Sequence, residues 1–90
     1  MQQHTTDIET IEDGVRAYIV ESFLTEQDVM TFQNDADLLL MLDSLQILRM
    51  VIALEKQYGI KVHESELAPE HLGSVSKIAA FIARKQTDQS

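Results

Sequence analysis

Residues 44–58 constrain the fold more than any other segment, because they form a helical pattern that is apolar around nearly its whole circumference. After the first residue, only Gln46 and Arg49 are polar before Glu55. A helix that is apolar on all sides is normally buried on all sides. In a chain of 90 residues, a bundle of three or four helices cannot enclose it completely. One apolar strip should therefore stay at the surface, where such strips usually mark a partner site, unless the long connection before the helix covers it.

The two ends of this helix carry clear signals. Asp43 is a good N-cap, worth about 1 kcal/mol over Ala, because its carboxylate accepts free N–H groups of the first turn. Gly59 is a natural left-handed terminator. We therefore expect the helix to run from Ser44 to about Tyr58.

Two further helical segments precede and follow this one. Thr6 is the expected N-cap of the first, with Glu9 completing a capping box, and this helix should end near residues 22–24. A short third helix or turn is expected between Glu64 and Leu72, disturbed by Pro69. The first helix has one apolar stripe at three- and four-residue steps: Ile8, Ile11, Val15, Ile19 and Phe23.

The last helix should span about Val75 to Lys85, with Arg84 and Lys85 suited to its C-terminal dipole. Its predicted core positions are Val75, Ile78, Ala79, Phe81 and Ile82. The connection from Thr25 to Leu42 is irregular, but its scattered apolar residues indicate that it packs on the bundle. The prediction is an all-α four-helix bundle, with three main helices, a short third helix and a long loop between helices 1 and 2. Residues 1–90 should form one domain, because so short a chain cannot divide into two cores.

The charge distribution excludes several classes of partner. The net charge is −8, and residues 1–43 hold ten acids against one base, Arg16. Nucleic acid and anionic membranes need clustered Lys and Arg, which this chain lacks, so proteins with basic patches are the expected partners. No secretory signal and no membrane span are recognisable, which predicts a cytoplasmic location. The chain has no Cys, so any thiol chemistry must come from a group added to it.

Ser44 directly follows the Asp43 cap, at a helix N-terminus whose free N–H groups and positive dipole end favour a phosphate ester. On its own this is ordinary helix-start chemistry. The surrounding motifs, however, resemble the acyl carrier protein family across residues 35–82. The matching strings are Asp43-Ser44-Leu45, Val51-Ile52-Ala53, Leu54-Glu55, Tyr58-Gly59-Ile60, Leu72-Gly73-Ser74-Val75 and Ile78-Ala79-Ala80-Phe81-Ile82.

This resemblance implies a free-standing acyl carrier that performs no catalysis. Ser44 would accept 4′-phosphopantetheine from coenzyme A through a separate phosphopantetheinyl transferase, and Asp43 would help position the metal-bound phosphate. Acyl or aminoacyl groups would then be held as thioesters. The implied partners are that transferase, an acyl- or aminoacyl-loading enzyme and the synthase or transferase enzymes of a pathway, and the carrier is expected to be a monomer.

Two sets of residues on the second helix follow from this interpretation. Its core-facing side should include Met50, Leu54 and Tyr58, which would border any space that shelters an acyl chain. The expected partner-binding face consists of Leu45, Gln46, Leu48, Arg49 and Ile52.

The chain also departs from the pattern of carriers for fatty acid synthesis. Met41 stands where those carriers commonly have Gly, and Gln46, Arg49 and Lys56 replace acids on the second helix. The departures favour a specialised polyketide, nonribosomal or fatty-acid-like pathway.

Other readings of the same residues are weaker. Asp35, Asp37 and Asp43 resemble a calcium loop, but Leu40 occupies the position that needs Gly, and Gln46 the one that needs Glu. The three His residues, His4, His63 and His71, lack metal-ligand spacing, so no metal site is expected. No Ser-His-Asp order or nucleophile elbow indicates a hydrolase, and the acidic charge opposes a DNA-binding regulator. The main rival is a helical interaction adaptor with the same fold and no prosthetic arm.

Overall fold

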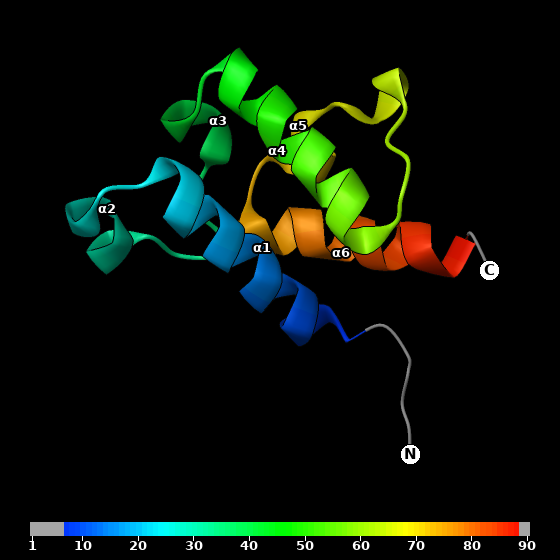
Figure 1. Cartoon of the computed structure of the whole chain (residues 1–90), viewed down its shortest axis with the longest axis horizontal. Coiled ribbons are helices and arrows are strands. Elements are labelled where there is room, and N and C mark those ends of the chain that lie inside the picture. The colour runs from blue at the N-terminus through cyan, green and yellow to red at the C-terminus, as the bar shows by residue number, and fades with distance from the viewer. Residues whose placement is uncertain (1–6, 89–90) are drawn as a thin grey trace.

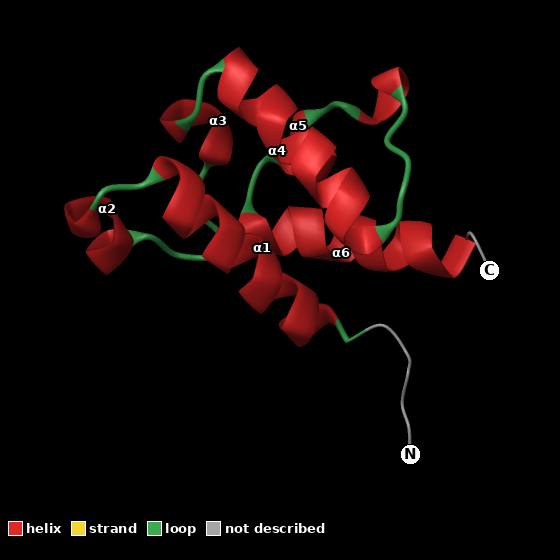
Figure 2. Cartoon of the chain, viewed as in Figure 1, coloured by secondary structure: helices red, strands yellow, loops and turns green. Residues whose placement is uncertain are grey.

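The described part of the chain is entirely helical. A computed structural model describes residues 7–88, and these contain no strand (Figure 2). The all-α prediction is confirmed, and the four expected helices correspond to α1, α4, α5 and α6 (Figure 1). The elements are α1 (Ile8–Phe23), α2 (Glu26–Thr31), α3 (Leu38–Met41), α4 (Ser44–Tyr58), a 3₁₀ turn (Glu64–Glu66), α5 (Pro69–Leu72) and α6 (Val75–Asp88).

The core lies between α1, α4 and α6. The most extensive packing joins α1 to α6, and α4 also packs on α1; in Figure 1, α1 and α4 slope in the same direction, while α6 runs nearly horizontally. All five core positions predicted for α6 are buried, although the helix continues three residues beyond Lys85. The fully buried large side chains, which define the centre of the core, are Val15, Ile19, Leu38, Met50, Val75, Ile78 and Ile82.

The cap of α1 differs from the prediction. Thr6 lies outside the described residues, and the carboxylate of Asp7 accepts the N–H of Glu9 at 3.0 Å and the hydroxyl of Thr10 at 3.0 Å. Asp ranks above Thr as an N-cap, so with both residues adjacent the helix starts one position later than predicted. The predicted end of the helix is confirmed at Phe23.

The connection between α1 and α4 contains two short helices, so its description as an irregular loop was wrong. Thr25 and Asp28 form a capping box at the start of α2, and the Asp37 carboxylate caps α3. Helices of six and four residues are too short to show a repeating apolar face in the sequence. The expectation that the connection packs on the bundle is confirmed, because Phe32 and Leu38 are buried.

Arg16, the single base of residues 1–43, attaches this connection to α1. Its guanidinium donates to the Phe32 carbonyl at 2.6 Å and to the Asn34 side-chain oxygen at 3.0 Å. It also lies 4.8 Å from the centre of the Phe32 ring, within the range of a cation–π contact. The one cation of this acidic half therefore has a structural role inside the fold.

Two backbone hydrogen bonds attach the connection to the start of α6. The Leu38 N–H donates to the Gly73 carbonyl at 2.8 Å, and the Ser76 N–H donates to the Asn34 carbonyl at 2.9 Å. Gly73 also ends α5, in a turn so tight that a Cβ there would lie 2.6 Å from the Pro69 carbonyl oxygen. The two hydrogen bonds hold the connection against the segment between α5 and α6.

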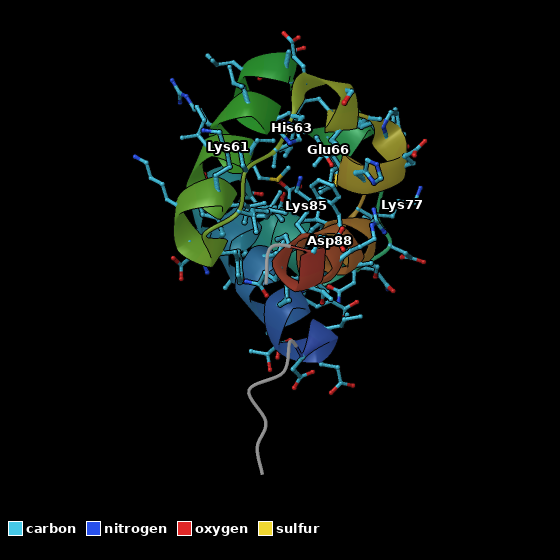
Figure 3. The ribbon with its side chains drawn as sticks, turned by 90° about the vertical axis from the view of Figure 1, so that its right-hand side faces the viewer. Lys61, His63, Glu66, Lys77, Lys85 and Asp88 are labelled. Atoms are coloured by element: carbon cyan, nitrogen blue, oxygen red, sulfur yellow. The ribbon has the colours of Figure 1, made fainter. Side chains whose placement is uncertain are left out.

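The expected short third helix is divided into the 3₁₀ turn and α5. Pro69 is the first residue of α5, where its missing N–H costs nothing, so it starts this helix and does not disturb it. In the turn, the Glu66 carboxylate accepts the His63 N–H at 2.9 Å and an ammonium hydrogen of Lys85 at 2.9 Å (Figure 3). The hydrogen bond from the His63 backbone, helped by Lys85, lowers the pKa of Glu66 from its ordinary value of 4.5.

The lowered pKa of Glu66 predicts an acid-sensitive contribution to stability. A carboxyl that holds its proton less tightly when folded stabilises the fold fully above its ordinary pKa. That stabilisation is lost as the pH falls below 4.5 and through the lower folded value. The wild type should therefore have a higher free energy of unfolding than Glu66→Gln at pH 7, and the difference between the two should become smaller toward pH 3. Denaturant titrations between pH 7 and pH 3 measure this difference. Glu64→Gln is the matched control, because Glu64 is exposed. A difference that stays constant with pH would contradict the prediction.

Candidate functional site

Ser44 is the first residue of α4 and is exposed. A capping box holds this end of the helix: the Asp43 carboxylate accepts the Gln46 N–H at 2.8 Å, and the Gln46 side-chain oxygen accepts the Asp43 N–H at 2.9 Å. The predicted start at Asp43 and end at Gly59, which has a φ of 65°, are both confirmed. Gln46, predicted to face partners, uses its side-chain oxygen to complete the cap.

The Ser44 hydroxyl is free of hydrogen bonds to residues 7–88. No His, Lys or carboxylate among residues 7–88 forms a hydrogen bond with it, and the neighbouring Asp43 carboxylate accepts the Gln46 N–H. A nucleophilic serine needs such a base. Ser44 is therefore an accessible hydroxyl at a helix N-terminus, suited to being modified by another protein.

The apolar strip predicted on α4 is present. Leu45, Leu48 and Ile52 are 57%, 48% and 45% exposed, and Arg49 beside them is exposed as well. The alternative, in which the connection between α1 and α4 covers this strip, was wrong, because that connection is held by Arg16 and the start of α6.

The sequence interpretation missed a second apolar surface, on α3. Leu39, Leu40 and Met41 are all exposed, Leu40 to 85%. Of the five consecutive apolar residues that precede Asp43, Leu38 and Leu42 are buried and the three between them face outward. The run of five apolar residues in the sequence could have indicated this surface. It has no helical or strand periodicity, however, that would separate core positions from exposed ones.

A groove of about 510 Å³ opens beside Ser44, between α4 and the segment around α5. Its walls are mainly apolar and include Leu39, Leu42, Ile47, Val51, Leu67 and Leu72. Met50, Leu54 and Tyr58, expected to border a sheltered space, line no part of it. Met50 and Leu54 are buried in the core, as predicted, while Tyr58 is half-buried, with its hydroxyl close to Gly14 of α1. Burial raises the pKa of the Tyr58 hydroxyl.

Among residues 7–88, no three His, Cys, Asp or Glu side chains come together in a group that could hold a metal ion. None of the helices in this range has the length and apolar character required to cross a membrane.

An exposed serine at a capped helix N-terminus, on an all-α bundle, is the arrangement that the resemblance to a carrier family predicts, and comparison with known proteins shows the family. Residues 14–82 match the family model described as a phosphopantetheine attachment site. The chain is also 35% identical over 79 residues to an acyl carrier protein of Akkermansia muciniphila, covering 86% of this chain and 94% of that protein. The chain belongs to the acyl carrier family, whose prosthetic group is a covalently attached phosphopantetheine.

Proposed function

We propose that Ser44 is the attachment residue for 4′-phosphopantetheine and that the protein carries acyl or aminoacyl intermediates between partner enzymes. The observation that carries the proposal is the exposed, unengaged Ser44 hydroxyl at the N-terminus of α4. Cargo is held as a thioester on the thiol of the attached group, a chemistry that a chain without Cys cannot supply itself.

The residues around Ser44 fit such a group. A phosphate ester on its hydroxyl would meet the positive end of the α4 dipole. The groove beside it offers apolar walls from Ile47, Val51 and Leu72, where part of an arm or its cargo can leave water. Asp43 would add a carboxylate that helps position a metal-bound phosphate during transfer.

The chemistry of loading belongs to partner enzymes. Because Ser44 has no activating base among the described residues, a phosphopantetheinyl transferase must provide one. The further partners are a loading enzyme and the synthase or transferase enzymes of the pathway, and we infer a monomeric carrier in the cytoplasm.

The departures on α4 favour a specialised pathway over general fatty acid synthesis. Met41 adds an exposed apolar side chain ahead of Asp43, and Arg49 and Lys56 replace acids on the exposed side of α4. A polyketide, nonribosomal or fatty-acid-like pathway with its own partner enzymes accounts for these changes.

Intact mass spectrometry tests the attachment directly. The purified chain is measured before and after incubation with coenzyme A and a broad-specificity phosphopantetheinyl transferase, and digested peptides locate the added group. A gain of one phosphopantetheine on Ser44 is the expected result. If the folded, initially unmodified chain gains nothing while a known carrier is modified in parallel, the adaptor without an arm becomes the better description.

Variants of Asp43 separate its two roles. Asp43→Ala removes the cap and should lower the free energy of unfolding by about 1 kcal/mol, whereas Asp43→Asn keeps an acceptor and should change it by less than about 0.5 kcal/mol. Both should slow phosphopantetheine transfer, because both remove the carboxylate. Denaturant titration and the time course of mass gain measure the two effects. If phosphopantetheine is transferred to Asp43→Asn at the wild-type rate, the Asp43 carboxylate has no role in transfer and acts only as a helix cap.

A further inference from the structure

The exposed side of α4 alternates apolar and cationic residues. At about 100° per residue, Leu45, Arg49, Ile52 and Lys56 fall within an arc of about 60° on one side of the helix. All four are exposed. We call these four residues the α4 stripe.

The two cations of the α4 stripe are not neutralised by any acid of the described residues. Neither Arg49 nor Lys56 forms an ion pair or hydrogen bond with any residue between 7 and 88. No acid stands three or four positions from either of them, the distances at which helical side chains meet. Glu55, the acid of α4, is half-buried, and its carboxylate accepts the Val62 N–H at 2.8 Å.

This local positive charge stands out on a protein with a net charge of −8. The exposed acids Glu9, Asp13 and Glu21 lie on α1, and Glu26 and Asp28 lie on α2. A partner attracted by the overall charge would therefore be drawn to acids on α1 and α2. The exposed acids Asp37 and Asp43 lie before Ser44, whereas the exposed side of α4 beyond it carries the cations Arg49 and Lys56.

We propose that the α4 stripe binds a partner protein whose docking surface is an apolar groove bordered by carboxylates. Arg49 and Lys56 are seven positions apart, so at 1.5 Å per residue their partners should be spaced about 10 Å along the groove. Carboxylates at that spacing pair with both cations while Leu45 and Ile52 enter the groove. This inference rests on the proposed function, since the partner is one of the enzymes that handle the cargo.

Paired synthetic peptides test the charge preference. One is an amphipathic helix with a leucine stripe and two Glu seven residues apart, and the other replaces both Glu with Lys. Each is titrated into the ¹⁵N-labelled, unmodified full chain, and NMR shift changes locate the site and give the affinity. The acidic peptide should shift the α4 stripe and bind there about three- to tenfold more tightly than the basic peptide.

Charge reversal provides the matched control. Arg49→Glu with Lys56→Glu should reverse the preference, so that the Lys peptide binds the stripe more tightly. Lys77→Glu with Arg84→Glu changes the net charge equally on α6 and should leave the preference unchanged. Lys77 lies on the opposite side of the molecule from Lys61, which follows the end of α4 (Figure 3).

Three results would overturn the proposal. One is that the acidic peptide causes no shift of the α4 stripe, and another is that the basic peptide binds there more tightly. The third is that the α6 double variant changes the peptide preference as much as the α4 double variant does. Concentration-dependent sedimentation with shifts at the stripe would assign the surface to a second copy of this chain. Tighter binding to anionic phosphatidylglycerol vesicles than to the acidic peptide would assign it to a membrane. Normal loading of Ser44 without a peptide preference would overturn this inference alone, whereas a peptide preference without loading would overturn only the proposed function.

Discussion

Ser44→Ala is expected to abolish phosphopantetheine attachment completely while leaving the fold intact. The hydroxyl oxygen forms the ester bond, and a methyl group offers no replacement for it. The side chain is exposed and forms no hydrogen bond with the described residues, so its loss should change the free energy of unfolding by less than about 0.5 kcal/mol. Intact mass after incubation with coenzyme A and the transferase measures attachment, and circular dichroism with denaturant titration measures folding.

Ser22→Ala is the matched control for this variant, because Ser22 is also an exposed helical serine. It should be modified as fully as the wild type. Attachment that persists in Ser44→Ala would show that another hydroxyl carries the group, and attachment lost in both variants would point to a damaged interaction with the transferase.

Leu38→Ala should be strongly destabilising, although Leu38 lies in the segment whose sequence looks like a loop. The side chain is completely buried, and its removal leaves a cavity between α3 and the core. Large-to-small changes of this kind cost about 2–5 kcal/mol. Because the Leu38 backbone also donates to Gly73, loosening α3 should disturb the groove beside Ser44. Denaturant titration gives the loss of stability, and NMR shifts of Leu42 and Ile47 report on the groove.

Leu40→Ala makes the same chemical change two residues away, at a side chain that is 85% exposed. It should alter stability by less than about 0.5 kcal/mol. Equal effects of the two substitutions would mean that the connection between α1 and α4 does not pack on the bundle as the structure shows.

The features that could be predicted correctly depend on neighbours in sequence. The start of α4 was recognisable because the Asp43 cap acts within the first turn of the helix. Its end was recognisable because Gly59 tolerates a left-handed backbone. The core side of α6 followed from its helical spacing. Ser44 as the candidate attachment residue came from local motifs as well, supported by the resemblance to a family.

The features that were missed depend on contacts between distant segments. The short helices α2 and α3 have local caps at Thr25 and Asp37 but are too short to show periodicity. The hydrogen bonds of Arg16, Leu38 and Ser76, which attach the connection to the bundle, join segments distant in sequence, and no local pattern reveals them. The core side of α4 was predicted correctly at Met50 and Leu54, but the groove beside Ser44 was not predicted, because it forms where α4 meets the segments around α3 and α5.

From the sequence alone it was determined that this chain forms an all-α bundle, that a long apolar helix starts at Asp43 and that Ser44 stands at its exposed end. Periodicity and capping carry that information, because they act over one or two turns. Only the tertiary structure decided that the connection between α1 and α4 leaves Leu45, Leu48 and Ile52 uncovered. It also decided that a groove opens beside Ser44, and that the Glu55 carboxylate accepts the Val62 N–H, so that Arg49 and Lys56 have no acidic partner among residues 7–88. The physical reason is that burial is a property of which surfaces meet, and for a helix apolar on every side the meeting surfaces are chosen by the rest of the fold.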